Sequence, residues 1–261
     1  MTNSTDLVQE QLNHSEYSQL LKATSKTLAL VTACGFVLGS VIYVSLGLGR
    51  SFPLPASACW VIVVLLIFRG LPYHRHSKFG TANTVTSFRA AGAIMLAGML
   101  PVSHTIVETS TALWIVSLCI AGLICFDGVD GFFARREKLT SDFGARFDME
   151  TDAFLALIVS LLIWDSGRAG IWVLGLGLMR YVFVFWSWFS PPLTAVLFPS
   201  MRRKVVCVIQ LGALCLMISP LLHGNAIMLV GVTALVCLSA SFLVDIVWLY
   251  RQASNDSEAG S

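Results

Sequence analysis

Residues 127–152 read DGVDGFFARREKLTSDFGARFDMETD and bring four aspartates together where two apolar stretches of membrane length meet. The aspartates are Asp127, Asp130, Asp148 and Asp152. Carboxylates are costly beside hydrocarbon, so those found in membrane segments mark functional sites. Four of them in one short stretch indicate that the site binds metal ions.

The composition places this stretch in an integral membrane protein. Of the 261 residues, 56% are hydrophobic and only 12% are charged, which leaves too little polar surface for an ordinary soluble domain. A helix needs roughly 20 apolar residues to cross about 30 Å of hydrocarbon. Stretches of about this length predict an all-α fold with about eight transmembrane helices, at 28–49, 51–68, 90–107, 109–126, 144–164, 169–189, 205–222 and 224–250.

Basic residues orient these helices. Clusters of Arg and Lys at 69–89, 135–146 and 202–204 fall in alternate loops, and the opposite loops carry few cations. By the positive-inside rule the clusters, the aspartates and both termini lie in the cytoplasm. We therefore expect a protein of a bacterial inner membrane, with its site facing the cytosol and a basic rim that attracts anionic membrane lipids.

The spacing of the aspartates predicts two facing pairs. Asp130 is three positions after Asp127 and Asp152 is four positions after Asp148, so on helices each pair projects from one face. The glycines and cations between the pairs indicate a helix end and a cytoplasmic turn that returns the chain antiparallel. The two pairs can then form one site.

Divalent cations relieve the repulsion between these carboxylates. Ligands that are all oxygen favour Mg²⁺ or Mn²⁺ over zinc or copper. Two such ions suggest phosphoryl or phosphodiester chemistry, in which metals activate the attacking oxygen and neutralise the leaving phosphate. A cation or proton transporter would also place aspartates in a membrane cavity and is the alternative to a phosphoryl transferase.

The pattern resembles, at every specified position, the signature D-x2-D-G-x2-A-R-x8-G-x3-D-x3-D of the CDP-alcohol phosphotransferases. Asn83-x2-Thr86-x2-Arg89 is also similar to the stretch that opens the family's first core helix, although Ala82 stands where the family often has proline. The resemblance covers roughly residues 75 to 250.

This resemblance implies a reaction and roles for the residues. An alcohol would attack the β-phosphorus of a CDP-alcohol, commonly CDP-diacylglycerol, and CMP would leave. Two Mg²⁺ or Mn²⁺ ions would be held by Asp127, Asp130, Asp148 and Asp152, and Asp152 would also be the catalytic general base. The nucleotide pocket would be formed by Gly131, Ala134, Arg135, Gly144, Asn83, Thr86 and Arg89.

The resemblance also implies the organisation of the chain. We expect a six-helix catalytic domain at 70–251, preceded by two additional transmembrane helices at 28–69 whose purpose the sequence does not reveal. Residues 1–27 form a polar cytoplasmic segment without the features of a cleaved signal peptide, and 252–261 form a flexible tail. A homodimer is an expectation from the family alone.

Cations in the second half suggest that the acceptor alcohol carries a phosphate. The candidates are Arg180, inside an otherwise apolar segment, and Arg202, Arg203 and Lys204. The pattern Lys204-x5-Gln210 is similar to one in phosphatidylglycerophosphate synthases, whose acceptor is glycerol 3-phosphate. Inositol phosphate is the alternative acceptor.

Other polar and aromatic residues receive simpler interpretations. His74 and His76 are interpreted as solvated residues of a polar linker, and Asp245 as an interfacial residue. The tryptophans are interpreted as lipid-facing, so we expect no nucleic-acid partner. A protein that binds lipid without catalysis is a further alternative, but no signature position is altered here.

Overall fold

The structure is a computed structural model that describes residues 14–45, 53–74, 76, 78–137, 141–194 and 200–259. For 127–137, and for a few other residues near helix ends, it describes the backbone alone. Within these ranges the chain forms α-helices and short 3-10 helices and no β-strand. It divides into two compact units, Met1–Leu155 and Ala156–Ser261.

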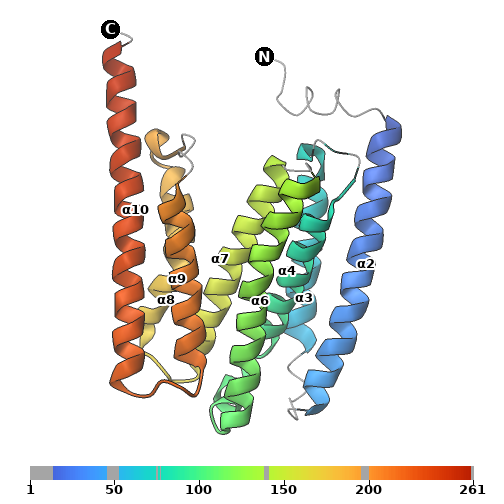
Figure 1. Ribbon diagram of the computed structural model, residues 1–261, viewed down its shortest axis with the longest axis vertical. Coiled ribbons are helices and arrows are strands. Elements are labelled where there is room, and N and C mark those ends of the chain that lie inside the picture. The colour runs from blue at the N-terminus through green and yellow to red at the C-terminus, as the bar shows by residue number, and fades with distance from the viewer. Residues whose placement is uncertain are drawn as a thin grey trace. The chain divides into compact units, whose positions relative to one another are not determined.

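The first unit contains the helices of the N-terminal half (Figure 1). They are α2 (His14–Ser45), α3 (Pro53–Gly70), η1 (Leu71–Tyr73), α4 (Thr81–Gly98), η2 (Leu100–Val102), α5 (Ser103–Ile106) and α6 (Ser110–Glu137), followed by the start of α7 (Asp142–Asp165). The second unit contains the rest of α7, η3 (Ile171–Val173), α8 (Leu174–Ser187), η4 (Pro191–Thr194), α9 (Met201–Ile218) and α10 (Asn225–Ala259).

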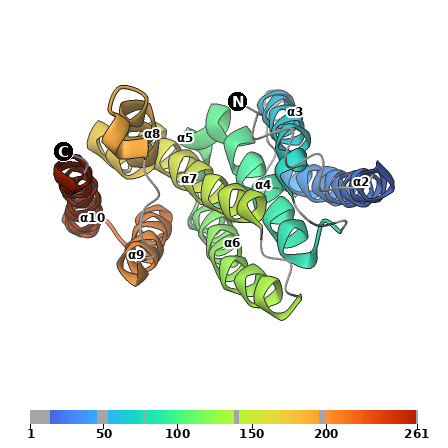
Figure 2. The ribbon, with the colours of Figure 1, turned by 90° about the horizontal axis from the view of Figure 1, so that it is seen from above.

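Helix α4 is the centre of the first unit. It contacts α2, α3 and α6, and Figure 2 shows it between them. Its buried face includes Ala90, Ala93 and Ala97. At Gly92 a Cβ would lie 2.5 Å from a methyl carbon of Leu123 on α6. Small residues therefore let neighbouring helix backbones approach closely, as is usual where membrane helices meet.

The second unit is held together by contacts of α10 with α8 and α9 and by polar bonds to backbone carbonyls. The Arg168 guanidinium donates hydrogen bonds to the carbonyls of Met217, Ser219 and Leu222 at 2.6–2.9 Å. These carbonyls lie at and just beyond the end of α9, where a helix leaves such groups without partners. Arg168 thus ties the loop after α7 to the end of α9.

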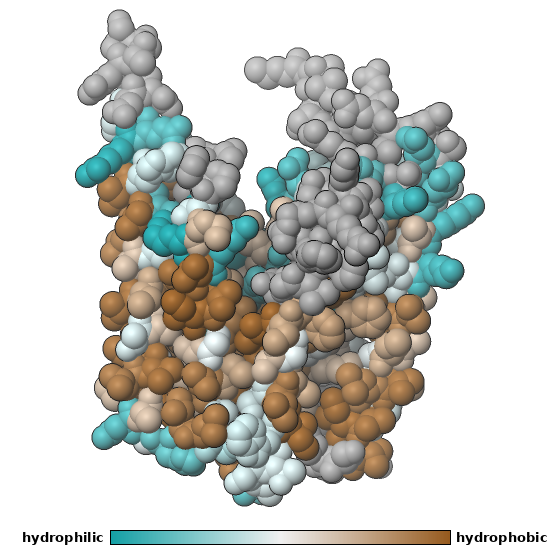
Figure 3. Space-filling view, in the orientation of Figure 1, coloured by the Kyte–Doolittle hydropathy of each residue, from teal (hydrophilic) through white to brown (hydrophobic). Residues whose placement is uncertain are grey.

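The protein is an all-α membrane protein, as the composition predicted. Among the described residues, four helices are long and apolar enough to cross a membrane: Glu16–Ile42, Ala56–Tyr73, Thr81–Ile106 and Asn225–Ser254. Two shorter apolar helices, Ser110–Phe126 and Ile171–Ser187, lie at further predicted spans. In each unit, hydrophobic residues cover the middle of the helices and hydrophilic residues gather near their ends (Figure 3). Helices α7 and α9 occupy the two remaining predicted positions and carry charges in their N-terminal halves.

Both ends of the described chain are more helical than the sequence suggested. Helix α2 begins at His14, well before the expected start of the first span, because Leu20, Thr24 and Leu28 recur on one buried face. Helix α10 continues to Ala259, through most of the segment expected to form a tail.

Gly177→Ala should destabilise the second unit. A Cβ at Gly177 would lie 2.7 Å from the Cα of Leu157 and 3.1 Å from the carbonyl oxygen of Ala156. Both contacts are with the backbone of α7, which cannot rotate away as a side chain can. We expect a loss of about 1–3 kcal/mol, the usual cost of overpacking, measured as thermal unfolding in detergent micelles.

Gly212→Ala is the matched control. Gly212 is also a helical glycine of the second unit, but a Cβ there would meet no atom within 4 Å. Alanine is the better helix former by roughly 1 kcal/mol, so this variant should match or exceed the wild type in stability. Equal melting temperatures for the two variants would contradict the close approach of α7 and α8 at Gly177.

Candidate active site

The start of α7 is fixed by a side-chain cap. Ser141 immediately precedes the helix, and its Oγ accepts a hydrogen bond from the backbone N–H of Gly144 at 3.0 Å. Such a cap satisfies one of the amide groups that a helix start leaves without a partner. The cap therefore sets where α7 begins, and with it the position of the two motif aspartates farther along the helix.

Gly144 lies against Asn83 of α4. A Cβ at Gly144 would lie 2.8 Å from Asn83 Oδ1, so the approach of this amide requires glycine. Asn83 is buried, and its Nδ2 donates to the backbone carbonyl of Phe79 at 2.5 Å. The structure thus brings together two residues that the sequence analysis assigned to the nucleotide pocket.

Arg89 joins α4 to both aspartates of α7. Its Nη1 donates to Asp148 Oδ1 at 2.5 Å, and its Nη2 donates to Asp152 Oδ1. The Arg89 side chain is only 1% exposed, whereas Asp152 is 16% and Asp148 38% exposed. One guanidinium reaches both carboxylates, which confirms that the two aspartates share a face of the helix. Asp148 is the more accessible partner.

The charges of this group favour a cation. Two carboxylates share a single guanidinium, so the three side chains together carry a formal excess of one negative charge. The guanidinium is buried, and charges interact more strongly where water is excluded. A positively charged ligand at the exposed side of Asp148 would therefore be attracted.

The other predicted site residues on α6 lie outside the described side chains. They are Asp127, Asp130, Gly131, Ala134 and Arg135. Their backbone belongs to α6, which contacts α4. The helix predicted at Asp127 and Asp130 is confirmed, and it continues to Glu137, past Gly131 and Arg135, which were expected to mark its end and the following turn. Their roles stay predictions.

The described carboxylates fit a divalent ion in their chemistry. Asp148 and Asp152 offer hard oxygen ligands, which Mg²⁺ and Mn²⁺ prefer, and Asp148 reaches solvent. Among the described side chains no three His, Cys, Asp or Glu gather as a metal site. Asp127 and Asp130 would complete the predicted set of ligands.

Thr86 is buried on α4, one turn before Arg89. Its Oγ1 donates to the carbonyl of Ala82 at 3.0 Å, within the same helix. Its predicted role in nucleotide binding stays a prediction.

The predicted acceptor residues lie in the second unit. Arg202, in the first turn of α9, donates through Nη1 to the carbonyl and hydroxyl of Ser241 and through Nη2 to Asp245 Oδ1 at 2.5 Å. Arg203 Nη1 lies 3.6 Å from the same Asp245 oxygen. Lys204 follows in the same turn, and Arg180 is half-buried on α8. Asp245 is therefore a buried partner of two arginines, and its predicted place at the membrane interface stays a prediction.

His74 was wrongly interpreted as a solvated residue. It is fully buried, and its Nε2 lies 2.8 Å from the carbonyl oxygen of Lys78. A carbonyl only accepts hydrogen bonds, so Nε2 carries a proton, and Nδ1 lies 2.9 Å from Ser141 Oγ. Burial lowers the pKa of His74, which favours the neutral ring whose Nδ1 accepts the Ser141 hydroxyl proton.

The sequence carries a signal for the Ser141 cap but none for the burial of His74. A serine directly before an apolar helix is a standard N-cap signal, so Ser141 could have been marked as the start of α7. Nothing in the sequence near His74 indicates burial, because its contacts with Ser141 and Phe143 come from a segment far along the chain.

Comparison with known protein families matches the CDP-alcohol phosphatidyltransferase model to residues 79–240, more than half of the chain. The chain belongs to the CDP-alcohol phosphatidyltransferase family. The match contains all of the signature residues and begins just before α4. No curated protein and no solved structure matched the chain.

Membership in the CDP-alcohol phosphatidyltransferase family carries general properties. The protein is a membrane transferase of phospholipid synthesis that uses a CDP-alcohol donor and an alcohol acceptor. The family generally depends on divalent metal ions. Helices α2 and α3 lie before the matched residues.

Proposed function

We propose that the protein transfers the phosphatidyl group of CDP-diacylglycerol to glycerol 3-phosphate and releases CMP at the cytoplasmic face of a bacterial inner membrane. The observation that carries the reaction class is the Arg89 bridge to Asp148 and Asp152, inside a complete family signature. This bridge supports the proposal because it holds two carboxylates of the family signature in fixed positions.

Two Mg²⁺ or Mn²⁺ ions, held by Asp127, Asp130, Asp148 and Asp152, would supply neutralisation of the donor diphosphate and polarisation of the reacting phosphorus. Arg89 fixes the direction of Asp148 and Asp152 before any substrate binds, because its bonds to both are already formed. Preorganised charges of this kind need little rearrangement as the reaction proceeds.

The proposed reaction exchanges one P–O bond for another. The acceptor hydroxyl oxygen attacks the β-phosphorus of the donor, and the bond from that phosphorus to the bridging oxygen of CMP breaks. The hydroxyl proton passes to the Asp152 carboxylate, and the electrons of the broken bond leave with CMP. Asn83, Gly144 and Arg135 are proposed to hold the nucleotide and its diphosphate.

Glycerol 3-phosphate is the proposed acceptor because of the cations at the start of α9. Arg202, Arg203 and Lys204 lie together there, and the Asp245 carboxylate lies within ion-pair distance of the first two. Asp245 also orients Arg202, which favours a fixed anion pocket over a mobile basic loop. A phosphate suits a cluster of three cations, whereas a neutral alcohol does not require such a cluster.

The purified protein in lipid–detergent micelles should release CMP from CDP-diacylglycerol only when Mg²⁺ or Mn²⁺ and the correct acceptor are present. We would compare glycerol 3-phosphate, inositol phosphate, inositol, serine and no acceptor, and identify the lipid product by mass spectrometry. Release with glycerol 3-phosphate alone is expected. Release with another alcohol would overturn the acceptor, and no release in any reaction with intact protein would overturn the transferase proposal.

A further inference from the structure

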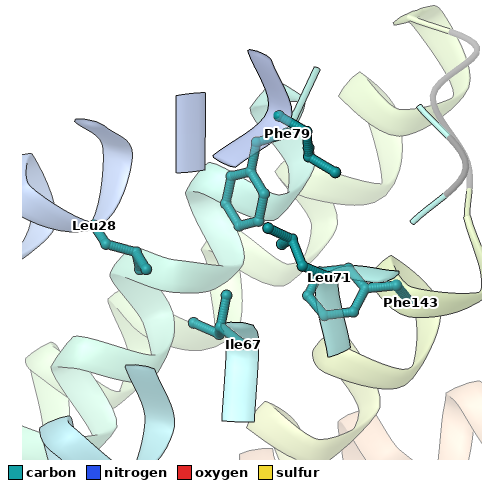
Figure 4. Packing of buried hydrophobic residues seen from close by; sticks show 6 residues of the cluster. Leu28, Ile67, Leu71, Phe79 and Phe143 are labelled. Atoms are coloured by element: carbon teal, nitrogen blue, oxygen red, sulfur yellow. The ribbon is translucent and has the colours of Figure 1, made fainter. Parts of the chain in front are cut away.

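The helices before the family domain share a core with the start of α7. A cluster of buried residues joins Leu20 and Leu28 of α2, Ile67 of α3 and Leu71 of η1 to residues near the site. Those residues are Phe79, just before α4, and Phe143, in the first turn of α7. Figure 4 shows the side chain of Leu71 beside that of Phe143, with Phe79 on its other side. Elements outside the matched region are thus packed against an element inside it.

His74 adds a polar connection to this core. Its ring lies edge-on to Phe143, with ring centres 5.7 Å apart, and accepts the Ser141 hydroxyl through Nδ1 at 2.9 Å. Ser141 in turn caps α7 at Gly144. A continuous set of bonds therefore runs from the segment after α3 to the first turn of α7.

The far end of this connection reaches the proposed nucleotide pocket. Gly144 is in contact with Asn83, which is itself tied to the carbonyl of Phe79 in the same apolar cluster. Asp148 follows Gly144 by four residues, about one turn along α7. A displacement of the capped turn would therefore move Gly144 away from Asn83, while Arg89 would still hold Asp148.

We propose that α2, α3 and η1 form a scaffold that positions the active site, and that His74 is the positioning residue through which the scaffold holds the Ser141 cap of α7. This assigns a role to the two helices that precede the family domain. The inference rests on the proposed function only where it concerns the nucleotide donor. The part that concerns the helix start stands on the geometry alone.

The test removes the two hydrogen bonds of His74 separately. In His74→Asn the amide oxygen can take the place of Nδ1 and accept from Ser141, whereas in His74→Gln the amide nitrogen can take the place of Nε2 and donate to Lys78. His74→Phe removes both bonds and keeps a ring in the buried site. Thr32→Val is the control, because it removes the 2.9 Å hydrogen bond from Trp60 Nε1, which joins α2 to α3 and involves neither His74 nor Ser141.

The first readout is amide hydrogen exchange at Gly144 and Ala145. Loss of a helix cap raises the equilibrium constant for opening of the first turn by a factor of about five. The amides of Gly144 and Ala145 should therefore exchange about fivefold faster in His74→Phe and His74→Gln. His74→Asn and Thr32→Val should exchange at the wild-type rate. If His74→Phe and Thr32→Val gave the same exchange at these amides, the scaffold proposal would be overturned. Ser141→Ala replaces His74→Phe if that variant does not fold.

The second readout is the kinetics of CMP release. His74→Phe and His74→Gln should raise the KM for the CDP-linked donor several-fold, with a smaller change in kcat, because Arg89 still holds Asp148 and Asp152. Faster exchange with an unchanged KM would overturn the positioning role and leave only a structural cap. If the wild type released no CMP, the proposed function would fail, and the exchange comparison would still decide whether His74 holds the cap.

Discussion

Asp148→Asn should lower the rate of CMP release by about a thousandfold, while the protein still inserts into membranes and folds. Metal-assisted charge neutralisation contributes several kcal/mol to such reactions, and each 1.36 kcal/mol corresponds to a factor of ten in rate. Asn keeps the size of the side chain and an oxygen that can accept from Arg89. It removes the negative charge at the more exposed of the two carboxylates.

Asp142→Asn is the matched control for this variant. Asp142 is an exposed residue in the first turn of the same helix and occupies a position that the signature does not specify. It undergoes the same chemical change and should keep nearly full activity. Normal CMP release by Asp148→Asn would show that this carboxylate has no part in the reaction.

Arg89→Gln should make the stability of the protein depend on divalent ions. Without the guanidinium, two carboxylates on one helix face lose their shared cation. Breaking a buried ion pair costs about 3–5 kcal/mol, and we expect about 3 kcal/mol because Asp148 reaches solvent. Thermal unfolding in the presence of a chelator should show a large loss, and Mg²⁺ or Mn²⁺ should restore a substantial part of it.

Arg69→Gln controls for the loss of a cation from the same unit. Arg69 is exposed in the last turn of α3, where such a change costs little. The wild type should respond to divalent ions less than Arg89→Gln does, because its carboxylates already have a partner. If Arg89→Gln unfolded at the same temperature with and without the ions, the carboxylates would not form a cation site with this arginine.

The sequence predicted the helices and the aspartate pair better than it predicted their surroundings. The alternation of long apolar stretches with basic loops is a strong signal, and helices occupy all of the predicted span positions. The four-residue spacing of Asp148 and Asp152 was sufficient to place both on one face, where Arg89 now holds them. Local patterns of this kind need no knowledge of distant residues.

Contacts between distant segments explain what the sequence did not show. His74 looked solvated because its neighbours Arg75, His76 and Lys78 are polar, yet its burial depends on Phe79 and Phe143 packing around it. The start of α2 was missed because the polar residues among 14–27 hide a buried face that only the packing of the helix reveals. The ion pairs of Asp245 could not be predicted because its partners, Arg202 and Arg203, lie on another helix.

The proposed site draws its residues from three helices, α4, α6 and α7. Arg89 of α4 holds Asp148 and Asp152 of α7, and Asn83 of α4 lies against Gly144 of α7. The partners on α6 were predicted from the family signature. The proposal that all four aspartates hold metal therefore needs a direct count of bound ions.

Equilibrium binding of Mn²⁺ to the purified protein, followed by electron paramagnetic resonance, tests this claim most directly. In the presence of the CDP-linked donor we expect two ions bound per chain in the wild type, the same number in Asp142→Asn and a reduced number in Asp148→Asn. Metal-independent CMP release by a protein that binds no Mn²⁺ would contradict the account, because the four aspartates would then have another purpose.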